Sequence, residues 1–353
     1  MNRRKLTRVI NPQRILIIRP SALGDVARSV PVLVSLRAAF PDARIDWLVQ
    51  DSFVDVIRAH PALTEAIAFP RNEFSRMVRQ LRLPSLVGYL STLRDRQYDV
   101  VLDCQGLLRS GVLAWSTRAP IRLGHADARE LGWLGLTRRV PSSNRSHTVD
   151  RMLTLVEALG IRTHRDAEAM RLYTPKESTE FSRIKGLSPH RYILLAPTSR
   201  WPGKQWPAIK FASLASTLAD EGKTIVIVGS RAEAASIQPL LELATKHSCI
   251  RSFVGDTNLA ELMNLIEHSS LVVANDSAAL HIAVGFHRPT VALFGPTRID
   301  HVGPYQRDDD VIQHLRPDDR FNHKDTASGQ SMMDRISVAE VLDAVRAKVT
   351  AGS

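Results

Sequence analysis

Residues 14–29 read RILIIRPSALGDVARS, and this stretch decides the class of fold. RILII is a short apolar run of strand length, and a break of Pro, Ser and Gly follows it before Asp25. The pattern predicts a buried strand that ends in a polar loop and continues as a helix over 25–40. Because open α/β sheets bind ligands at the carboxyl ends of their strands, the loop also indicates a functional site.

The same alternation of strand-like and helix-like segments fills both halves of the chain. Strands are predicted at 14–18, 44–49, 66–69, 98–104 and 121–125, and then at 192–197, 224–230, 251–255, 271–276 and 290–295. A long basic helix is predicted to end near Gln97, and further helices are predicted at 106–116, 207–220 and 337–349. The last of these begins with a capping box of Ser337 and Glu340. This order predicts an α/β fold with two parallel sheets and a cleft between them.

The domain boundaries follow a stretch of weak periodicity. Residues 160–191 are rich in charge and contain Pro175 and Pro189, which favours a connection between domains. We predict one domain over 1–165, a linker over 166–190, a second domain over 191–330 and a C-terminal helix and tail over 331–353.

The composition favours an ordinary globular protein. The chain has 353 residues, of which 44% are hydrophobic and 24% charged, and it has no apolar run of membrane-spanning length. Cys104 and Cys249 lie far apart, without the spacing of a disulfide framework or a zinc site. We therefore expect a cytoplasmic protein.

Positive charge is concentrated in the first half. Residues 1–160 hold 24 Lys and Arg against 14 Asp and Glu, whereas residues 161–353 hold 23 against 22. Such a surface favours an anionic partner, which can be a nucleic acid, an acidic lipid headgroup or a phosphorylated substrate. One predicted helix carries four arginines that either bind this partner or form a solvated face: Arg71, Arg76, Arg79 and Arg82.

The usual nucleotide-binding motifs are missing at the first turn, where neither GxGxxG nor GxxxxGK[ST] occurs. The best alternative phosphate site is NDSAALH at 275–281, which joins a strand to the small residues of a helix start. Asp276 or Ser277 either helps to bind an anion there or only caps the helix. His281 lies one turn further on.

Two further loops after strands carry suitable groups. In PTSRWPGKQWP, at 197–207, Thr198 and Ser199 offer hydroxyls and Lys204 offers a charge that would neutralise a departing diphosphate. Glu233 in GSRAE either accepts the ribose hydroxyls of a nucleotide or is only a first-turn helix acid.

Asp25 is the candidate proton acceptor. Gly24, which has no side chain, would let a substrate approach the backbone before it. A carboxylate that faces a phosphate site in the other domain is placed to take a proton from an attacking hydroxyl. Asp103, at the end of the predicted strand 98–104, either lines the same cleft or is structural, and we favour the structural role.

Six segments in order along nearly the whole chain resemble the lipopolysaccharide heptosyltransferases, glycosyltransferase family 9. They are SALGDV, DCQGLLRSG, TSRWPGKQWP, VGSRAE, GDTNLAEL and NDSAALHIAVGFHRPTVALFGPT. The resemblance implies the GT-B fold, with two Rossmann-like domains whose parallel sheets face each other across a cleft. It implies an acceptor-binding N-terminal domain and a nucleotide-sugar-binding C-terminal domain. The implied reaction is metal-independent transfer, with inversion, of heptose from ADP-heptose to the lipopolysaccharide inner core, either Kdo-lipid A or heptosyl-Kdo-lipid A.

The resemblance also implies roles for individual residues. Asp25 matches the catalytic base, and Ser21 and Gly24 match its loop. The donor-binding positions are Thr198 and Lys204 at the phosphates, Glu233 at the ribose, Thr257 beside the adenine, and Asp276, Ser277, Ala278 and His281 at the sugar diphosphate. Ala278 stands where the family often has Gly, which leaves less room beside the phosphates.

The resemblance implies no cofactor and no metal. The acidic runs 308–310 and 318–319 are interpreted as solvated loops. The acceptor would be an anionic lipid, so the arginines from Arg71 to Arg82 are expected to bind it. They would hold the enzyme peripherally at the inner face of the inner membrane. No nucleic acid partner is expected.

Three other functions remain open at this point. One is a family 9 transferase with another nucleotide sugar or another cell-envelope acceptor. The second is a basic, non-catalytic nucleic-acid-binding protein, disfavoured by the low aromatic content of 6% and the missing binding modules. The third is a nicotinamide oxidoreductase, disfavoured by the missing GxGxxG.

Overall fold

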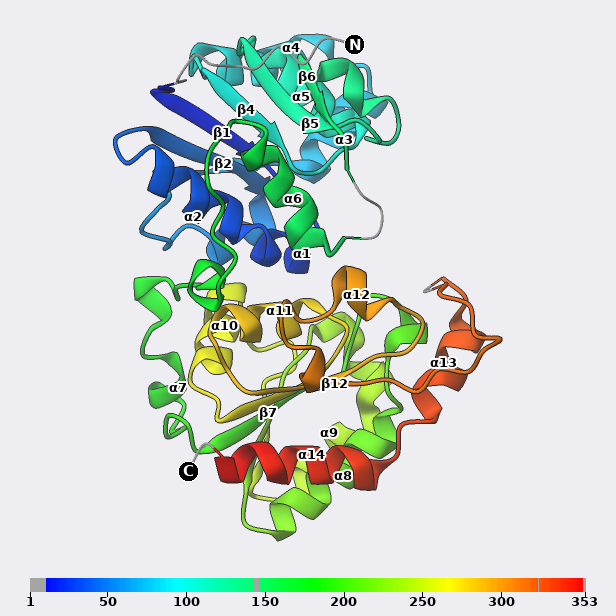
Figure 1. Cartoon of the computed structure of the whole chain (residues 1–353). Coiled ribbons are helices and arrows are strands. Elements are labelled where there is room, and N and C mark those ends of the chain that lie inside the picture. The colour runs from blue at the N-terminus through cyan, green and yellow to red at the C-terminus, as the bar shows by residue number, and fades with distance from the viewer. Residues whose placement is uncertain (1–10, 143–145, 323, 352–353) are drawn as a thin grey trace. The chain divides into compact units, whose positions relative to one another are not determined.

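The chain folds into two compact units, Met1–Met170 and Arg171–Ser353, which we call the N-terminal and C-terminal units (Figure 1). This is seen in a computed structural model that describes residues 11–142, 146–322 and 324–351. Each unit has its own β-sheet. The stretch 166–190, predicted as a connection, contains the short helical segments η3 (Ala167–Met170), η4 (Lys176–Ser178) and α7 (Phe181–Ile184).

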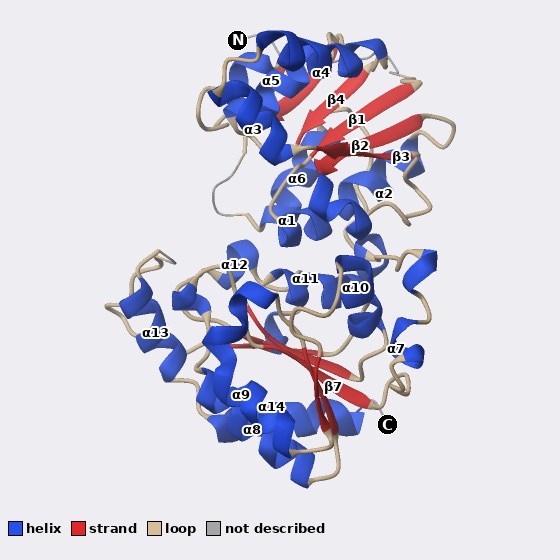
Figure 2. Cartoon of the chain, turned by 180° about the vertical axis from the view of Figure 1, so that it is seen from behind, coloured by secondary structure: helices blue, strands red, loops and turns tan. Residues whose placement is uncertain are grey.

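The N-terminal sheet is fully parallel with the strand order β3-β2-β1-β4-β5-β6. Its strands are β1 (Arg14–Ile18), β2 (Arg44–Gln50), β3 (Glu65–Phe69), β4 (Val100–Asp103), β5 (Ile121–His125) and β6 (Arg138–Val140). Its helices are α1 (Leu23–Arg28), α2 (Val30–Ala39), α3 (Arg71–Arg79), α4 (Leu83–Asp95), α5 (Leu108–Ser116) and α6 (Thr148–Glu157), with the 3₁₀ helices η1 (Asp51–Val56) and η2 (Gly132–Gly135). Helices α3, α4 and α5 cover one face of the sheet, whereas α2 and α6 cover the other (Figure 2).

The C-terminal sheet is also fully parallel, in the order β12-β11-β10-β7-β8-β9. Its strands are β7 (Tyr192–Ala196), β8 (Thr224–Ile227), β9 (Ile250–Ser252), β10 (Leu271–Asn275), β11 (Thr290–Leu293) and β12 (Val311–Ile312). Its longer helices are α8 (Ala208–Asp220), α9 (Gln238–Lys246), α10 (Leu259–Glu267), α11 (Ala278–Gly285), α13 (Thr326–Asp334) and α14 (Val338–Ala351). The shorter ones are α12 (Ile299–Val302), η5 (Pro202–Lys204), η6 (Arg231–Ile237) and η7 (Asp308–Asp310).

The two sheets share one topology. Each starts with a central strand, adds two strands on one side and then crosses back to add three on the other. The direction therefore reverses between β1 and β4 in the first unit and between β7 and β10 in the second. These are topological switch points, where loops diverge and leave a crevice at the carboxyl ends of the strands. The predicted α/β fold with two Rossmann-like domains is confirmed.

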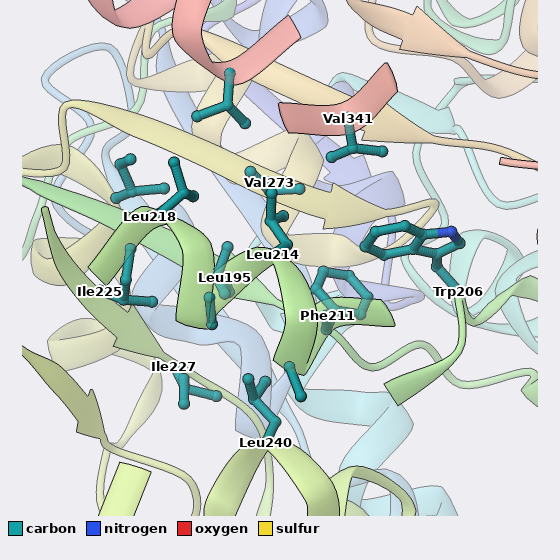
Figure 3. Close-up of a cluster of buried hydrophobic side chains, with 14 of the residues drawn as sticks. Leu195, Trp206, Phe211, Leu214, Leu218, Ile225, Ile227, Leu240, Val273 and Val341 are labelled. Carbon is teal, nitrogen blue, oxygen red and sulfur yellow. The ribbon is translucent and has the colours of Figure 1, made fainter. Parts of the chain in front are cut away.

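Buried apolar side chains explain why the central segments form strands. In β1 the residues from Ile15 to Ile18 are fully buried, because both faces of a parallel sheet are covered by helices. In the C-terminal unit a single apolar cluster joins the sheet to α8, α9 and α14 (Figure 3). Trp206 belongs to this cluster, with its ring centroid 4.9 Å from that of Phe211 and its Nε1 donating to the Ile336 carbonyl at 3.0 Å. Trp206 is thus a core residue.

Two predicted helices are each divided in two. The helix predicted over 25–40 breaks at Ser29, whose Oγ donates to the Asp25 carbonyl, and restarts as α2 with Pro31 in its first turn. The long basic helix predicted to end near Gln97 breaks at Leu81, which has a φ of 50°, and restarts as α4. Arg82 is consequently the N-cap of α4 and does not share a helix with the other three arginines.

The last helix begins as predicted, whereas two short strands were missed. Ser337 accepts a hydrogen bond from the Glu340 amide at 3.2 Å, as the predicted capping box requires of its first residue. Strands β6 and β12 were not predicted, because three and two residues are too few to show a period.

Candidate functional site

Asp25 lies at the switch point of the N-terminal unit, in the first turn of α1. Its Oδ2 is 2.8 Å from Nη2 of Arg19 and accepts a hydrogen bond from the Ala22 amide at 3.3 Å, while Oδ1 is ion-paired with Arg28. Both arginines are buried, but the Asp25 side chain keeps 25% of its surface exposed. We call Asp25, Arg19 and Arg28 the carboxylate clamp.

The clamp keeps Asp25 ionised. Burial alone would raise the pKa of the Asp25 carboxyl, but the charges of Arg19 and Arg28 outweigh burial and hold the pKa well below its usual range. The group is therefore a carboxylate at any physiological pH, which is the form that accepts a proton.

The loops after β1 and β4 are tied together beside the clamp. Arg19 also donates to the carbonyl of Cys104, which follows β4, and the Ser21 amide donates to Oε1 of Gln105 at 3.1 Å. Ser21 and Gly24 are both partly exposed in this loop. The sequence predicted Ser21, Gly24 and Asp25 here, but it did not single out Arg19, Arg28 or Gln105.

Asp103 proves to be structural. It is fully buried, and its Oδ1 accepts from the amides of Gln105 and Gly106 at 2.9 and 3.0 Å while Oδ2 accepts from the Ser110 hydroxyl at 2.9 Å. Burial raises the pKa of Asp103 to about 6, although these hydrogen bonds oppose the rise. The side chain holds the turn after β4 and has no surface for a substrate.

The four arginines predicted to bind an anionic partner differ in their exposure. Arg76, Arg79 and Arg82 are exposed, whereas Arg71 is half-buried and donates to Oε1 of Gln50 at 3.1 Å. Burial lowers the pKa of Arg109 in α5, and the nearby charge of Arg71 lowers it further, so the two guanidinium groups lie close to each other. Two like charges at one place attract an anion.

In the C-terminal unit, Lys204 and Asp276 meet at the switch point. Nζ of Lys204 is 2.6 Å from Oδ2 of Asp276, which also accepts the Thr297 hydroxyl at 2.9 Å. Lys204 and Asp276 are both largely buried. Asp276 therefore fixes the position of the ammonium group. Thr297 was not singled out by sequence, although it ends the quoted segment that runs from Asn275 through FGPT.

Asn275 positions the loop that carries Lys204. Its Nδ2 donates to the Pro197 carbonyl at 2.6 Å, and its Oδ1 accepts the Trp206 amide at 3.0 Å. Ser199 donates to the Asp276 carbonyl at 3.0 Å, which ties the same loop to the end of β10. Thr198 is buried beside Gly229, where a Cβ would lie 3.6 Å from the Thr198 hydroxyl.

The start of α11 offers unused donors. Ser277 is the N-cap residue of α11, but its hydroxyl makes no capping bond and is buried without a hydrogen-bond partner among the described residues. Since the first amides of a helix lack partners within the helix, this hydroxyl and the amides after it are donors of the kind that an anion can use. Ala278 lies in the first turn, partly exposed, and His281 is buried one turn further on.

Glu233 and Thr257 lie after the two neighbouring strands, β8 and β9. Glu233 accepts both the amide and the hydroxyl of Ser230, at 2.9 and 2.6 Å, in the capping box of η6. Thr257 is partly exposed and precedes Asn258, the N-cap of α10. All predicted donor-binding residues therefore belong to loops or helix starts that follow β7, β8, β9 or β10.

The acidic runs are not freely solvated. Asp310 is ion-paired with Lys348 and accepts the Thr290 hydroxyl, and Asp319 is ion-paired with Arg335, so the side chains of Asp310 and Asp319 are only 14% and 10% exposed. The interpretation as solvated loops is wrong for these two residues, because folding brings basic partners to them from α14 and from the residue that follows α13. Within the described ranges, no group of three or more His, Cys, Asp or Glu is arranged to hold a metal ion.

The part of the chain that the structure describes has no helix with both the length and the apolar character that a membrane span needs.

A family model named glycosyltransferase family 9 (heptosyltransferase) matches residues 89–330. Lipopolysaccharide heptosyltransferase 2 of Escherichia coli K12 is 28% identical over 346 residues, which cover 95% of this chain and 98% of that protein. Lipopolysaccharide heptosyltransferase 1 of Pseudomonas aeruginosa is 26% identical and covers 83% of this chain and 82% of its own length.

Solved structures share the fold over nearly the whole chain. The structure of E. coli ADP-heptose lps heptosyltransferase II superposes with a TM-score of 0.77 at 23% identity and covers 96% of this chain and 99% of its own. The E. coli heptosyltransferase WaaC with ADP-2-deoxy-2-fluoro heptose has a TM-score of 0.74 at 21% identity, and the match covers 95% of this chain and 99% of that one. The two Rossmann-like units are thus those of the GT-B fold.

Proposed function

Because the chain belongs to glycosyltransferase family 9, we propose that this glycosyltransferase moves heptose from ADP-heptose to the inner core of lipopolysaccharide. The names of the relatives support this choice of sugar and acceptor. The observation that carries the proposal is the group of polar side chains that follows β7 and β10 in the C-terminal unit. There Lys204 is ion-paired with Asp276, and the buried hydroxyl of the next residue, Ser277, has no hydrogen-bond partner among the described residues.

The C-terminal unit binds the donor in this proposal. The diphosphate lies against the start of α11, where Ser277, the amide of Ala278 and the Lys204 ammonium offset its charge. Asp276 and Ser199 position this group, and Thr198 and His281 border it. Glu233 turns from its capping contact to the ribose, and Thr257 lies beside the adenine. The role of Lys204 grows during reaction, since ADP leaves with more negative charge than it carries as an ester.

The N-terminal unit binds the acceptor, and Asp25 is the base. The acceptor hydroxyl attacks the anomeric carbon from the face opposite ADP, so that the new C–O bond forms, the bond to the diphosphate breaks and the configuration inverts. A carboxylate paired with two guanidinium groups is a weak base. The proton therefore passes to Asp25 late, when bond formation has made the attacking oxygen most acidic.

The acceptor in this proposal is the anionic Kdo-lipid A or heptosyl-Kdo-lipid A at the inner face of the inner membrane. Arg71, with Arg109 close to it, forms the first contact, and Arg76, Arg79 and Arg82 add exposed charge on α3 and at the start of α4. The reaction needs no metal, because Lys204 and the helix start supply the charge that a metal ion would supply.

One experiment tests donor and reaction together. Purified protein is offered a panel of ADP-, GDP- and UDP-sugars with Kdo-lipid A or heptosyl-Kdo-lipid A, and the released nucleotide and the glycosylated lipid are measured. We expect release of ADP only with ADP-heptose and only when acceptor is present. Release with another nucleotide sugar would replace the donor assignment, and a product with retained configuration would remove the direct displacement.

A further inference from the structure

Large apolar side chains are exposed mainly on the N-terminal unit. Four of them belong to α5, η2 and the N-cap of η2: Leu108, Trp115, Leu131 and Leu134, with exposed fractions of 46, 45, 57 and 59%. Together with Val112 they line an apolar groove. We call these four residues the α5–η2 patch.

The groove is built into the fold. Gly111 of α5 and both glycines of η2 pack backbone to backbone, and a Cβ on Gly135 would lie 1.9 Å from the Gly111 carbonyl oxygen. Only glycine permits such an approach. The two helices are therefore held close together, while Leu108, Trp115 and Leu134 on them stay exposed.

Arginine is the main charged residue in the segment that carries the α5–η2 patch. Residues 107–139 contain six Arg and no Lys, against Asp127 and Glu130. The guanidinium of Arg118 lies 4.5 Å from the Trp115 ring centroid, and that of Arg139 lies 4.0 Å from the Trp133 centroid. Tryptophan with an apolar body and a polar edge, flanked by arginines, is the composition that favours the boundary between lipid headgroups and acyl chains.

A second exposed apolar group belongs to helices that neighbour α5 in the same unit. Val78, Leu81, Leu83 and Val87, from the end of α3 and the start of α4, are 49 to 77% exposed. Helix α4 packs on α5, and all three helices lie on the same face of the sheet (Figure 2). Arg76, Arg79 and Arg82 add three exposed positive charges beside these residues.

We propose that the α5–η2 patch, with its arginine rim, docks on an anionic phospholipid bilayer. The leucines and Trp115 enter the headgroup boundary, and Arg118 and Arg139 pair with lipid phosphates. A second copy of the chain is a poorer occupant, since a twofold dimer would place the same arginines against each other. The inference gives the proposed membrane association its surface, and it rests on the proposed function only in that respect.

Vesicle cosedimentation tests the proposal with the full chain and no substrate. The wild type should bind vesicles of phosphatidylcholine and phosphatidylglycerol, more weakly at high salt, and should bind pure phosphatidylcholine far less. The double variant Leu131→Ser, Leu134→Ser should lose about tenfold in partition, since two leucines no longer leave water. The matched control is Ile184→Ser, Ile209→Ser, which changes two exposed isoleucines of the C-terminal unit and should bind as the wild type.

A second pair of variants separates charge from apolar contact. Arg118→Ser and Arg139→Ser should each weaken binding to the anionic vesicles by about fivefold and reduce its salt dependence. Unchanged melting temperature and unchanged ADP release on a short soluble acceptor would show that all these variants are folded, and would keep a failure of docking distinct from a failure of the transferase reaction.

Three results would overturn the docking surface. One is a wild type that does not bind anionic vesicles. Another is a double variant at Leu131 and Leu134 that binds anionic vesicles as strongly as the wild type or the isoleucine control does. The third is loss of a dimer in light scattering by that variant while vesicle binding stays the same, which would assign the patch to a second copy.

Discussion

The N-terminal and C-terminal switch points have the same strand order and opposite chemistry. At the first, a carboxylate is held by two arginines in the clamp around Asp25. At the second, an ammonium group is held by the carboxylate of Asp276, next to a helix start whose Ser277 hydroxyl has no partner in the described part of the chain. The first arrangement preserves a proton acceptor, and the second leaves positive potential for an anion.

The comparison shows that topology determines where a site lies but not what it does. Both sheets have their switch point between the first and the fourth strand of the unit, which is where ligands bind in open α/β sheets. The charge in that crevice comes from a few loop residues, which differ between the units. Each of the following tests changes one side of this comparison.

The largest effect is expected from removing the proton acceptor. Asp25→Asn should lower kcat by about 10³-fold, because the amide cannot take the proton from the acceptor hydroxyl. The affinity for ADP, measured by calorimetry, should stay unchanged, since the nucleotide is assigned to the other unit. Asp95→Asn, an exposed change on α4, serves as the control. Normal turnover by the Asp25 variant would remove the base assignment.

The next effect concerns stability and compares Asp103 with Asp25. The pKa of Asp103 is 3.8 in the unfolded chain and about 6 in the folded protein. Between pH 3.8 and 6 the folded state therefore binds a proton that the unfolded state has lost. Its contribution to the free energy of unfolding therefore falls by about 3 kcal/mol as pH rises through this window. Asp25, with a lowered pKa, behaves oppositely and loses its contribution only as pH falls below 3.8.

Denaturant unfolding from pH 4 to pH 7 measures this difference. The gap in stability between Asp103→Asn and the wild type should change by about 3 kcal/mol over this range, in the direction that favours the variant at higher pH. The exposed Asp42→Asn should run parallel to the wild type. Parallel curves for Asp103→Asn as well would mean that the buried carboxyl keeps an ordinary pKa.

Removing the positive charge of the C-terminal site should have a somewhat smaller effect on catalysis than Asp25→Asn. Lys204→Met should lower kcat by about 10²-fold and weaken ADP binding, because the diphosphate loses a charged donor and Asp276 loses its partner. Lys223→Met, at an exposed position, provides the comparison. If ADP bound the Lys204 variant with full affinity, the nucleotide would have to lie elsewhere.

A small effect is expected at Ser277. Because its buried hydroxyl has no partner among the described residues, Ser277→Ala should not reduce stability, yet ADP affinity should fall by about fivefold. Ser199→Ala makes the opposite change, since it removes a hydrogen bond to the Asp276 carbonyl and should lower the melting temperature. A Ser277 variant that binds ADP normally would separate the helix start from the diphosphate.

No effect is expected from removing divalent metal ions. In the proposed function, Lys204 and the start of α11 supply positive potential at the leaving diphosphate, so activity in EDTA should equal activity in buffer. Loss of activity that added Mg²⁺ restores would give the stabilising role to a metal ion instead.

Much of the fold could be predicted from runs of consecutive residues. RILII, YILLA and LVVAN are apolar over four or five positions, and their β1, β7 and β10 strands are fully covered by helices. The helix breaks at Ser29 and Leu81 were missed because no glycine marks them and Pro31 and Pro84 suit a helix start as well as they end one.

For the candidate site, the sequence predicted which loops carry the polar residues but not which of these residues contact each other. The sequence placed Lys204 and Asp276 after two different strands, and only the pairing of β7 with β10 brings them within 2.6 Å across 72 positions. The clamp arginines were missed because Arg19 and Arg28 look like part of a generally basic surface, whereas both are buried against Asp25.

The sequence by itself determined the two parallel sheets, the polar loops at their carboxyl ends and the basic character of the first half, because period and composition are properties of neighbouring residues. The tertiary structure alone decided that Asp25 is paired with two arginines, that Asp103 and Trp206 are structural and that the Ser277 hydroxyl is left without a partner among the residues described. Burial and the partner of a charge depend on strand register and helix packing, which join residues far apart in the chain.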